Sequence, residues 1–376
     1  MPIKVMTLVG TRPEVIKLCR VIHALDRVAH HVLAHTGQNY DYELNQVFFD
    51  QLEIRKPDRF LEVAAGMLGE TLGNIMARSY AVLAEEQPDA LLLLGDTNSC
   101  LAAICAKRLK IPVFHMEAGN RCFDERVPEE LNRRVVDHVS DINLPYTEHA
   151  RRYLLAEGIR PETVIKTGSP MREVLQHYRA QIERCDVLQR LDLTAAGYFL
   201  VSAHREENVD DAQRLRDLLE TLDALHTAYG RPVIVSTHPR TRQRLNELGV
   251  QAAGGVRFLP AMGFFDYVRL EMSARCVLSD SGTLTEEASI LDFPAVAIRQ
   301  AHERPEGMDE ATLVMCGLKR ERVLEAVALV TRQFKEGERR FRAIPDYEPA
   351  NVSDKVVRII LSYVDYVNRV VWRKPV

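Results

Sequence analysis

Short apolar runs alternate with amphipathic stretches of helical spacing along the whole sequence. Each run ends at a polar or glycine-containing turn, and a helical stretch usually follows. Near-continuous apolar strands are typical of a parallel sheet that is buried on both faces. The pattern therefore predicts an α/β protein with parallel strands in IKVMTLVG, HHVLAHTG, ALLLLGD, VFHMEAG and INLPYT, and then in YFLVSAHRE, PVIVSTHP, RFLPA, CVLSDSG and PAVAIRQ.

The strand–helix pattern pauses once and then starts again, which predicts two domains. A chain of 376 residues is also longer than one hydrophobic core usually supports. Between the halves lies TGSPMREVL, whose glycine, serine and proline supply turn chemistry. We expect two doubly wound, Rossmann-like domains that face a cleft, at 1–169 and 170–354, and a C-terminal helix at about 355–376 that is long enough to pack back onto the first domain.

Composition argues against several classes of protein. The formal net charge is −4, from 49 basic and 53 acidic residues, so the chain lacks the general basic footprint of a nucleic-acid binder. Seven scattered cysteines without CxxC or zinc spacing indicate reduced thiols. The start MPIKVMTLVG resembles a strand rather than a signal peptide, and no apolar run of about 18 residues is present to span a membrane. We expect a soluble cytoplasmic protein without a metal, a cofactor, a nucleic-acid partner or membrane contact.

Candidate functional residues follow the strands, because ligands of open parallel sheets bind beyond the carboxyl ends. The turns contain neither GxGxxG nor GxxxxGK[ST], so the usual signatures of dinucleotide and nucleoside-triphosphate binding are missing. Instead, the turn Ser281–Thr283 opens a helix, where free N–H groups and the helix dipole favour an anion. One turn along, Glu286 or Glu287 could accept hydrogen bonds from a ribose diol, which together predicts a nucleoside diphosphate. The alternative is that both glutamates only complement the helix dipole.

The first strand ends in GTRPEVIK, which joins two basic residues to a helix start. Pro13 suits the first helical position, so Arg12 would lie just outside the helix, where its guanidinium can grip a phosphate. Lys17 lies four residues after Pro13, close to the same face. The alternative is an arginine and a lysine on a solvated helix.

Carboxylates follow two other strands of the first half. Asp96 and Glu117 each end an apolar run and can point into the cleft, although an acid in this position is often only an N-cap. Glu129 and Glu130 could simply open a helix after Pro128. A group of carboxylates in a closed site can have divergent pKa values, as acid–base chemistry requires.

Two histidines end strands in the second half. A single histidine in such a position is more often structural, but His204 and His238 occupy equivalent positions near Arg205 and Arg240, which modestly favours a functional role. No His/Asp/Glu spacing indicates a metal site. Other arginine clusters, such as Arg133–Arg134, are interpreted as solvated helix faces.

These motifs together resemble a known family. GTRPEVIK, GDTNS, MEAGNR, PEELNR, SAHRE, STHPR, SDSGTLTEE and ERPEG are similar, in this order and over nearly the whole chain, to the motifs of the non-hydrolysing UDP-N-acetylglucosamine 2-epimerases. The resemblance implies the two-domain fold of the B-type glycosyltransferases (GT-B). Within the family, the chain most resembles the branch that converts UDP-2-acetamido-2,6-dideoxy-L-talose to UDP-N-acetyl-L-fucosamine for capsule or O-antigen. The segments that carry this more specific resemblance are TGQNYDYELN, HMEAGNRCFDERVPEE, SAHREENVD, QAHERPEG and the C-terminal tail.

The resemblance also implies a mechanism and a set of roles. Family members remove the C2 proton while UDP leaves C1, and then add UDP back with the proton on the other face of C2. Acid–base roles fall on Asp96, Glu117 and Glu129, with Lys17 supporting the charge balance. Contacts to the UDP-sugar fall on Arg12, His204, Ser281, Glu287 and Arg304, and the candidate UDP-binding set also includes His238, Arg240, Gly282 and Thr283. The resemblance further implies a homodimer.

Two departures from the family pattern affect the interpretation. TGQN has Asn39 where the N-acetylglucosamine enzymes commonly have histidine, which argues against allosteric activation by UDP-N-acetylglucosamine. The usual Ser-Gly-Gly phosphate turn has Thr283 in place of its second glycine. The alternatives are a UDP-N-acetylglucosamine 2-epimerase that makes UDP-N-acetylmannosamine, a GT-B glycosyltransferase, and a non-catalytic nucleotide-sugar sensor.

Overall fold

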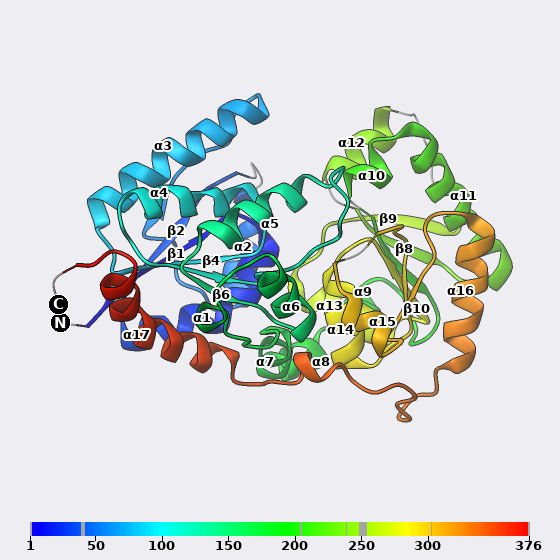
Figure 1. Ribbon diagram of the computed structural model, residues 1–376. Coiled ribbons are helices and arrows are strands. Elements are labelled where there is room, and N and C mark those ends of the chain that lie inside the picture. The colour runs from blue at the N-terminus through cyan, green and yellow to red at the C-terminus, as the bar shows by residue number, and fades with distance from the viewer. Residues whose placement is uncertain are drawn as a thin grey trace. The chain divides into compact units, whose positions relative to one another are not determined.

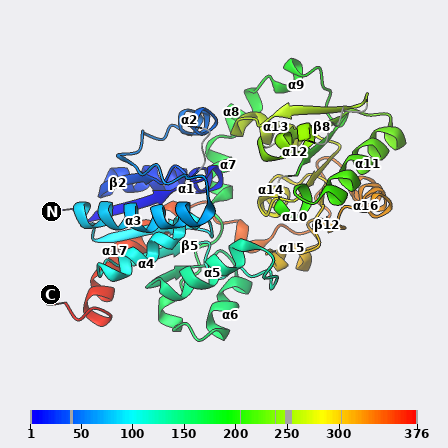
Figure 2. The same cartoon turned by 90° about the horizontal axis from the view of Figure 1, so that it is seen from above.

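The computed structural model describes residues 2–38, 42–203, 205–237, 239–247, 254–301 and 303–374. The chain divides into two compact units, of which the first comprises 1–176 and 345–376 and the second comprises 177–344. Both are built from a parallel sheet with helices around it (Figures 1 and 2). Each unit is described by itself.

The first unit contains a six-stranded sheet in the order β3-β2-β1-β4-β5-β6, and every pair in it is parallel. The side chains of Leu91 to Leu94 in the central β4 are almost completely buried, which explains the unbroken apolar run in the sequence. The strands are β1 (Lys4–Val9), β2 (His30–His35), β3 (Arg59–Phe60), β4 (Ala90–Leu94), β5 (Val113–Met116) and β6 (Ile142–Leu144).

Helices cover both faces of this first sheet, with α3 and α4 on one face and α1 and α17 on the other (Figure 1). The C-terminal helix α17 packs against α1. The helical elements of the unit are α1 (Arg12–Val28), α2 (Tyr42–Gln51), α3 (Leu68–Glu86), η1 (Asn98–Leu101), α4 (Ala102–Arg108), α5 (Pro128–Val139), α6 (Glu148–Ala156), η2 (Pro161–Thr163), α7 (Met171–His177), η3 (Pro345–Tyr347) and α17 (Val352–Val370).

The second unit repeats the same strand order, β12-β11-β10-β7-β8-β9, again with parallel pairs only. Its strands are β7 (Phe199–Ser202), β8 (Val233–Thr237), β9 (Val256–Pro260), β10 (Cys276–Ser279), β11 (Ala295–Ala297) and β12 (Val314–Met315). Its helices are α8 (Arg179–Arg184), α9 (Val187–Arg190), α10 (Glu206–Val209), α11 (Ala212–Tyr229), α12 (Pro239–Glu247), α13 (Phe264–Ser273), α14 (Thr283–Leu291), α15 (Pro305–Asp309) and α16 (Arg320–Gln333).

Strand order reverses once in each sheet, between β1 and β4 in the first unit and between β7 and β10 in the second. At such a switch point the following loops diverge to opposite faces and leave a ligand crevice at the carboxyl ends of the strands. The loops after β1, β4 and β5 therefore share one edge of the first sheet, and the loops after β7 and β10 share one edge of the second.

The predicted α/β class with parallel sheets is confirmed, and one local detail was wrong. Helix α1 begins at Arg12 with Thr11 as its N-cap, so Arg12 lies within the first turn rather than just outside it. The Glu14 carboxylate accepts from the Thr11 amide, as in one half of a capping box, and the helix starts one residue closer to the N-terminus than predicted. Among the described residues, no helix is both long enough and apolar enough to cross a membrane.

Candidate active site

The loop after β1 leaves no room for a side chain at its first position. A β-carbon on Gly10 would lie 2.1 Å from Ser99 Oγ and 2.4 Å from Thr36 Oγ1. The Gly10 and Thr11 amides donate to Glu14 Oε2, and the Thr97 hydroxyl donates to Glu14 Oε1 at 2.6 Å. Glu14 thus joins the loop after β1 to the loop after β4. Burial raises the pKa of Glu14 to about 7, against the lowering effect of these donors.

Glu117, directly after β5, forms an ion pair with Lys17 of α1. Lys17 Nζ lies 2.9 Å from Glu117 Oε1 and 2.8 Å from Oε2, and both side chains are largely buried. Glu117 has a φ of 63°, a left-handed backbone that costs a non-glycine residue about 1 kcal/mol or more. Its carboxylate also lies over Gly95, since a β-carbon there would come within 3.9 Å of Glu117 Oε2. The loops after β4 and β5 therefore meet beside Asp96.

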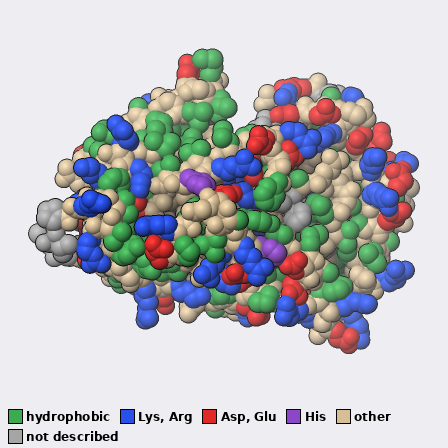
Figure 3. Space-filling view, in the orientation of Figure 1, with side chains coloured by type: hydrophobic (Ala, Val, Ile, Leu, Met, Phe, Trp, Pro, Cys, Tyr) green, Lys and Arg blue, Asp and Glu red, His purple; other side chains and the backbone are tan. Residues whose placement is uncertain are grey.

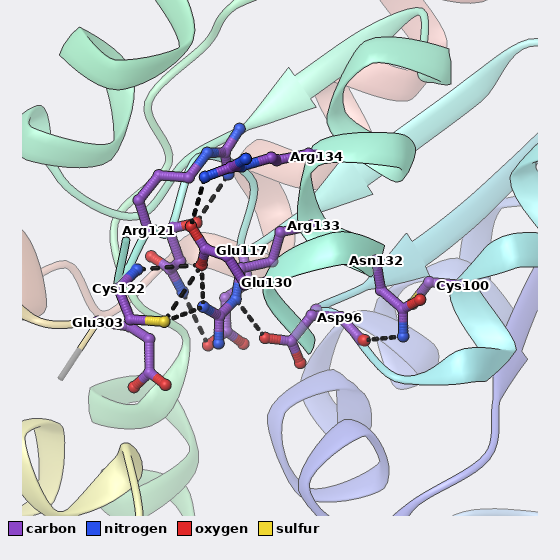
Figure 4. Close-up of polar contacts among 12 residues, drawn as sticks. Asp96, Cys100, Glu117, Arg121, Cys122, Glu130, Asn132, Arg133, Arg134 and Glu303 are labelled. Carbon is purple, nitrogen blue, oxygen red and sulfur yellow. Dashed lines mark hydrogen bonds and ion pairs between the residues drawn. The ribbon is translucent and has the colours of Figure 1, made fainter. Parts of the chain in front are cut away.

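Asp96, directly after β4, is held by a buried arginine. Arg133 Nε donates to Asp96 Oδ2 at 2.7 Å, and Arg133 Nη1 donates to Glu130 Oε2 at 2.7 Å, so one guanidinium lies between two carboxylates (Figure 4). Asn132 donates to the Asp96 carbonyl at 3.0 Å. Arg133 is buried, so its interpretation as part of a solvated helix face was wrong.

Glu129 and Glu130 open α5 but differ in surroundings. Glu130 is buried and accepts from the Cys122 amide at 3.0 Å as well as from Arg133. Burial raises the pKa of Glu130, but the Cys122 amide and the Arg133 charge outweigh it and the net pKa is lowered. Glu129, one residue earlier, is half-buried. Glu130 therefore fixes the loop before α5, while Glu129 keeps a more accessible carboxylate.

A buried charged cluster contacts the loops after β4 and β5. His115 of β5 faces Asp137 Oδ1 at 2.9 Å and the Gly95 carbonyl at 2.6 Å. Asp137 also accepts from the Gly119 amide and, at 2.7 Å, from Arg121 Nη1. Both ring nitrogens of His115 face oxygen acceptors, an arrangement that favours the doubly protonated, positively charged ring. Burial lowers the pKa of His115, but Asp137 and the Gly95 carbonyl outweigh it and raise the pKa.

The remaining basic candidate of the first unit lies in the first turn of α1. The Arg12 guanidinium stacks over the Phe48 ring of α2, 5.7 Å from its centroid. Within the described part of the chain, no three His, Cys, Asp or Glu side chains converge as metal ligands would.

In the second unit, the turn after β10 leads directly into α14. The Ser281 hydroxyl lies 2.9 Å from the Thr283 hydroxyl and accepts from the Thr283 amide at 3.4 Å. Gly282 is the N-cap and has a helical backbone that any residue could adopt. The role of the glycine is therefore its missing side chain, which leaves the turn uncovered. Asp280, fully buried, accepts from the Arg205 amide at 3.0 Å and thereby joins this turn to the loop after β7.

Buried ion pairs surround the same turn. Arg299 and Glu303 form a double contact at 2.9 and 3.0 Å, and Arg205 Nη2 lies 3.5 Å from Glu303 Oε1. A β-carbon on Gly282 would approach Arg205 Nη2 to 4.0 Å, so this guanidinium lies beside the turn. Arg304 donates to Glu286 Oε1 at 2.8 Å, and both are buried. Glu286 is therefore engaged within the protein, while Glu287 is the neighbouring carboxylate on α14.

Residues 23–361 match the protein family described as UDP-N-acetylglucosamine 2-epimerase. The chain belongs to this family. A solved UDP-N-acetylglucosamine 2-epimerase from Rickettsia bellii is 55% identical and covers all of both chains with a TM-score of 0.93. The Methanocaldococcus jannaschii enzyme, solved in complex with UDP-GlcNAc and UDP, is 32% identical with a TM-score of 0.89, over 96% of this chain and all of that one.

A third relative shows that the family extends to other sugars. The UDP-2,3-diacetamido-2,3-dideoxy-D-glucuronate 2-epimerase of Pseudomonas aeruginosa is 33% identical over 328 residues, which is 86% of this chain and 91% of that protein. The chain is thus an enzyme of the epimerase class that acts on UDP-sugars, and its two parallel sheets have the GT-B-type architecture. The family's members differ in the sugar that they carry.

The structure brings most of the predicted residues to the sheet edges but does not describe all of them. Lys17, Asp96 and Glu117 lie at the edge of the first sheet. Glu129 lies on α5, the helix that also carries Arg133, the partner of Asp96. Ser281 to Thr283, Glu287 and Arg304 gather around the start of α14. His204, His238 and Asn39, as well as the side chain of Arg240, lie outside the described residues.

Several residues of these sites were missed by sequence reasoning. They are Glu14, His115, Arg121, Arg133 and Asp137 in the first unit and Asp280 and Glu303 in the second. A usable signal existed for α5, where Glu130, Arg133 and Asp137 follow the i, i+3, i+7 spacing of one helix face. A charged stripe at this spacing can be a buried network as well as a solvated face.

Proposed function

We propose that this enzyme inverts C2 of a UDP-2-acetamido sugar by eliminating UDP and adding it back. The observation that carries the proposal is the Lys17–Glu117 pair next to Asp96, at the switch point of a chain that belongs to the epimerase family. Elimination requires a carboxylate that takes the C2 proton and a second acid that returns a proton on the other face. Asp96, Glu117 and Glu129 supply these groups.

The steps balance without a cofactor. A carboxylate takes the proton from C2, the C2–H electron pair forms the C1–C2 double bond, and the C1–O bond breaks as UDP leaves. In the return direction UDP adds to C1 while a carboxylic acid protonates C2 from the opposite face. Arg12 and the Ser281–Thr283 turn stabilise the charge that develops on the departing diphosphate, Glu287 accepts from the ribose hydroxyls, and Arg304 orders the turn through Glu286. The remaining UDP contacts are His204, His238 and Arg240.

We propose UDP-2-acetamido-2,6-dideoxy-L-talose as the substrate and UDP-N-acetyl-L-fucosamine as the product, used for capsule or O-antigen. The support is the similarity of TGQNYDYELN, SAHREENVD and QAHERPEG to that branch. The Pseudomonas aeruginosa relative acts on a different 2-acetamido sugar by its name, so the family accommodates changes at other carbons.

The alternative substrate is UDP-N-acetylglucosamine, with UDP-N-acetylmannosamine as product. It is favoured by the Rickettsia bellii enzyme, which is 55% identical and is named for this substrate. Both substrates present the same C2 acetamido group and the same UDP, so the two proposals share one mechanism. They differ in the C6 hydroxyl and in the configuration at C3 and C5, because one sugar has the L-talo and the other the D-gluco configuration.

Deuterium incorporation distinguishes these proposals. The purified protein is incubated in D₂O without added metal, with either UDP-sugar, and followed by NMR. We expect deuterium at C2 of the talose-type sugar and a new fucosamine-type anomeric signal. Exchange only with UDP-N-acetylglucosamine would identify the alternative. Absence of exchange with both would reject epimerisation of these sugars and direct attention to acceptor-dependent transfer.

We further propose that the enzyme forms a homodimer through α3. This helix leaves Met67 at its start, Leu68 and Tyr80 well exposed, whereas isolated soluble units rarely expose such side chains together. Figure 3 shows hydrophobic side chains over α3, while basic and acidic side chains are interspersed elsewhere on that face. Light scattering after size exclusion should give twice the chain mass of 42.7 kDa, and Leu68→Glu should reduce it to one chain mass.

A further inference from the structure

A buried glutamate lies behind the start of α14 without an ordinary partner. Glu271, in α13, is 0% exposed. Both of its carboxyl oxygens are buried, and no N–H or O–H group of the described residues donates to either one. A buried ionised carboxylate without donors is strongly disfavoured, because burial removes its hydration without replacement. The state of Glu271 therefore depends on what its carboxyl group contacts.

That contact is the carboxyl group of Glu287, the residue expected to accept from the ribose. The Glu271 and Glu287 carboxyl groups lie within hydrogen-bonding reach of each other, and Glu287 is itself only 7% exposed. Two ionised carboxylates are both acceptors, so the contact is repulsive unless one of them carries a proton. With one proton, the same contact becomes an O–H···O⁻ hydrogen bond, which is among the stronger kinds.

The surroundings assign the proton to Glu271. Burial and the neighbouring Glu287 charge raise the pKa of Glu271 well above its usual range. The Tyr267 hydroxyl interacts with both carboxyl groups and with Asp280 after β10, whereas the Tyr198 hydroxyl interacts with Glu271 and with the charge of Arg269. Among the described residues, none of these contacts brings a positive charge to Glu271. Glu287, the more exposed of the two, is the one that can present an ionised oxygen outward.

We propose that Glu271 is a positioning residue that stays protonated and donates to one oxygen of Glu287, which fixes the other Glu287 oxygen as the acceptor for the nucleotide's vicinal hydroxyls. The assignment rests on the proposed function, because it deepens the role of Glu287 in UDP binding. It gives the site one shared negative charge instead of two. It also explains how α14 can carry two adjacent glutamates near a diphosphate, since Glu286 is neutralised by Arg304.

Infrared spectroscopy tests the protonation directly. A protonated carboxyl group has a C=O stretching band that shifts in D₂O and is distinct from carboxylate bands. Wild type and Glu271→Gln are compared at a pH of about 8.5, where Glu14, with its pKa of about 7, is largely ionised. We expect the wild-type spectrum to contain a protonated-carboxyl band that Glu271→Gln removes. Glu286→Gln, a matched change of a buried carboxylate that is paired with Arg304, should leave the band unchanged.

Nucleotide affinity tests the positioning role. Glutamine can still donate to Glu287, whereas methionine has a similar length and no donor. Calorimetric titration with UDP should give Glu271→Gln an affinity within about twofold of wild type, and Glu271→Met an affinity about tenfold weaker, as the loss of one hydrogen bond to a charged group requires. Thermal melts of each variant verify that the second unit is folded.

The outcomes separate the two levels of the proposal. A difference spectrum without a protonated-carboxyl band overturns the assignment, as does a Glu271→Met variant that is folded and binds UDP like Glu271→Gln. Because Glu271→Gln is nearly the same size as the native residue, the infrared comparison still applies if the methionine variant fails to fold. Failure of the wild type to bind UDP would instead reject the proposed function.

Discussion

Replacing Asp137 by asparagine tests whether the buried cluster that contacts the loops after β4 and β5 is charged. Asp137 is fully buried and accepts from His115, Arg121 and the Gly119 amide. The substitution keeps the shape of the side chain but removes its charge. The imidazolium of His115 and the Arg121 guanidinium then lie buried with one negative partner fewer between them. Glu157 still pairs with Arg121, so the uncompensated charge falls mainly on His115.

The expected cost follows from the burial of the groups. Breaking a buried ion pair by removing one partner costs about 3–5 kcal/mol. The first unit contains about 200 residues, and for that size each kcal/mol lowers Tm by about 2–4 °C. We therefore expect Asp137→Asn to lower the Tm of the first unit by about 6–20 °C. Glu125→Gln, which removes an exposed partner of Arg134, should change the free energy of unfolding by less than about 0.5 kcal/mol.

The loss should also depend on pH in a defined direction. The folded pKa of His115 is raised above its ordinary value of 6.5, so its pairing stabilises the protein fully below about 6.5 and is lost as pH rises through the folded pKa. Melts of wild type and Asp137→Asn at several pH values should thus differ most under acidic conditions and less under alkaline ones, where only the loss of the Arg121 contact remains. A variant that melts within about 2 °C of wild type at pH 6 would refute the charged cluster.

Three further changes address the same sheet edge. Glu117→Gln should lower turnover by a factor of about 100 to 10,000 while leaving UDP affinity nearly unchanged, and joint loss of both in steady-state kinetics and calorimetry would indicate a structural role. Lys17→Met, which leaves the largely buried Glu117 carboxylate without its cation, should lower turnover at least tenfold, with Lys17→Arg retaining part of it. Because the pKa of Glu14 is raised from 4.5 to about 7, wild type should lose up to about 3 kcal/mol of unfolding free energy as pH rises from about 4.5 to 7, and Glu14→Gln should remove this slope in urea titrations.

The class of fold and the residues at the sheet edges could be predicted because they depend on local pattern. Strands buried on both faces must be apolar throughout, and the turn residues after them are polar because they leave the sheet. Lys17 and Glu117 are 100 residues apart, but both could be placed because β1 and β5 are parallel strands of one sheet. The sequence pattern could not reveal that they pair.

The supporting residues could not be predicted, because their burial is set by tertiary contacts. Arg133 belongs to PEELNRRVV, where charged residues are as compatible with a solvated helix as with a buried one. The Arg133 guanidinium is buried because it donates to Asp96 and Glu130, and the sequence pattern does not show these contacts. Glu271, in FFDYVRLEMS, likewise has no sequence feature that separates it from a surface glutamate, and its partner Glu287 lies on another helix.

The starts of α1 and α14 differ in a way that supports the proposed place of the diphosphate at α14. Both helices follow a central strand at a switch point, so both direct a helix dipole toward the sheet edge. In α1 the Gly10 and Thr11 amides donate to the side chain of Glu14, so these two donors already have a partner within the protein. In α14 the N-cap Gly282 has no side chain, and the described capping contact is the 3.4 Å approach of the Thr283 amide to Ser281 Oγ. The α14 amides can therefore exchange this long contact for a phosphate oxygen at little cost, while α1 offers its basic side chains instead.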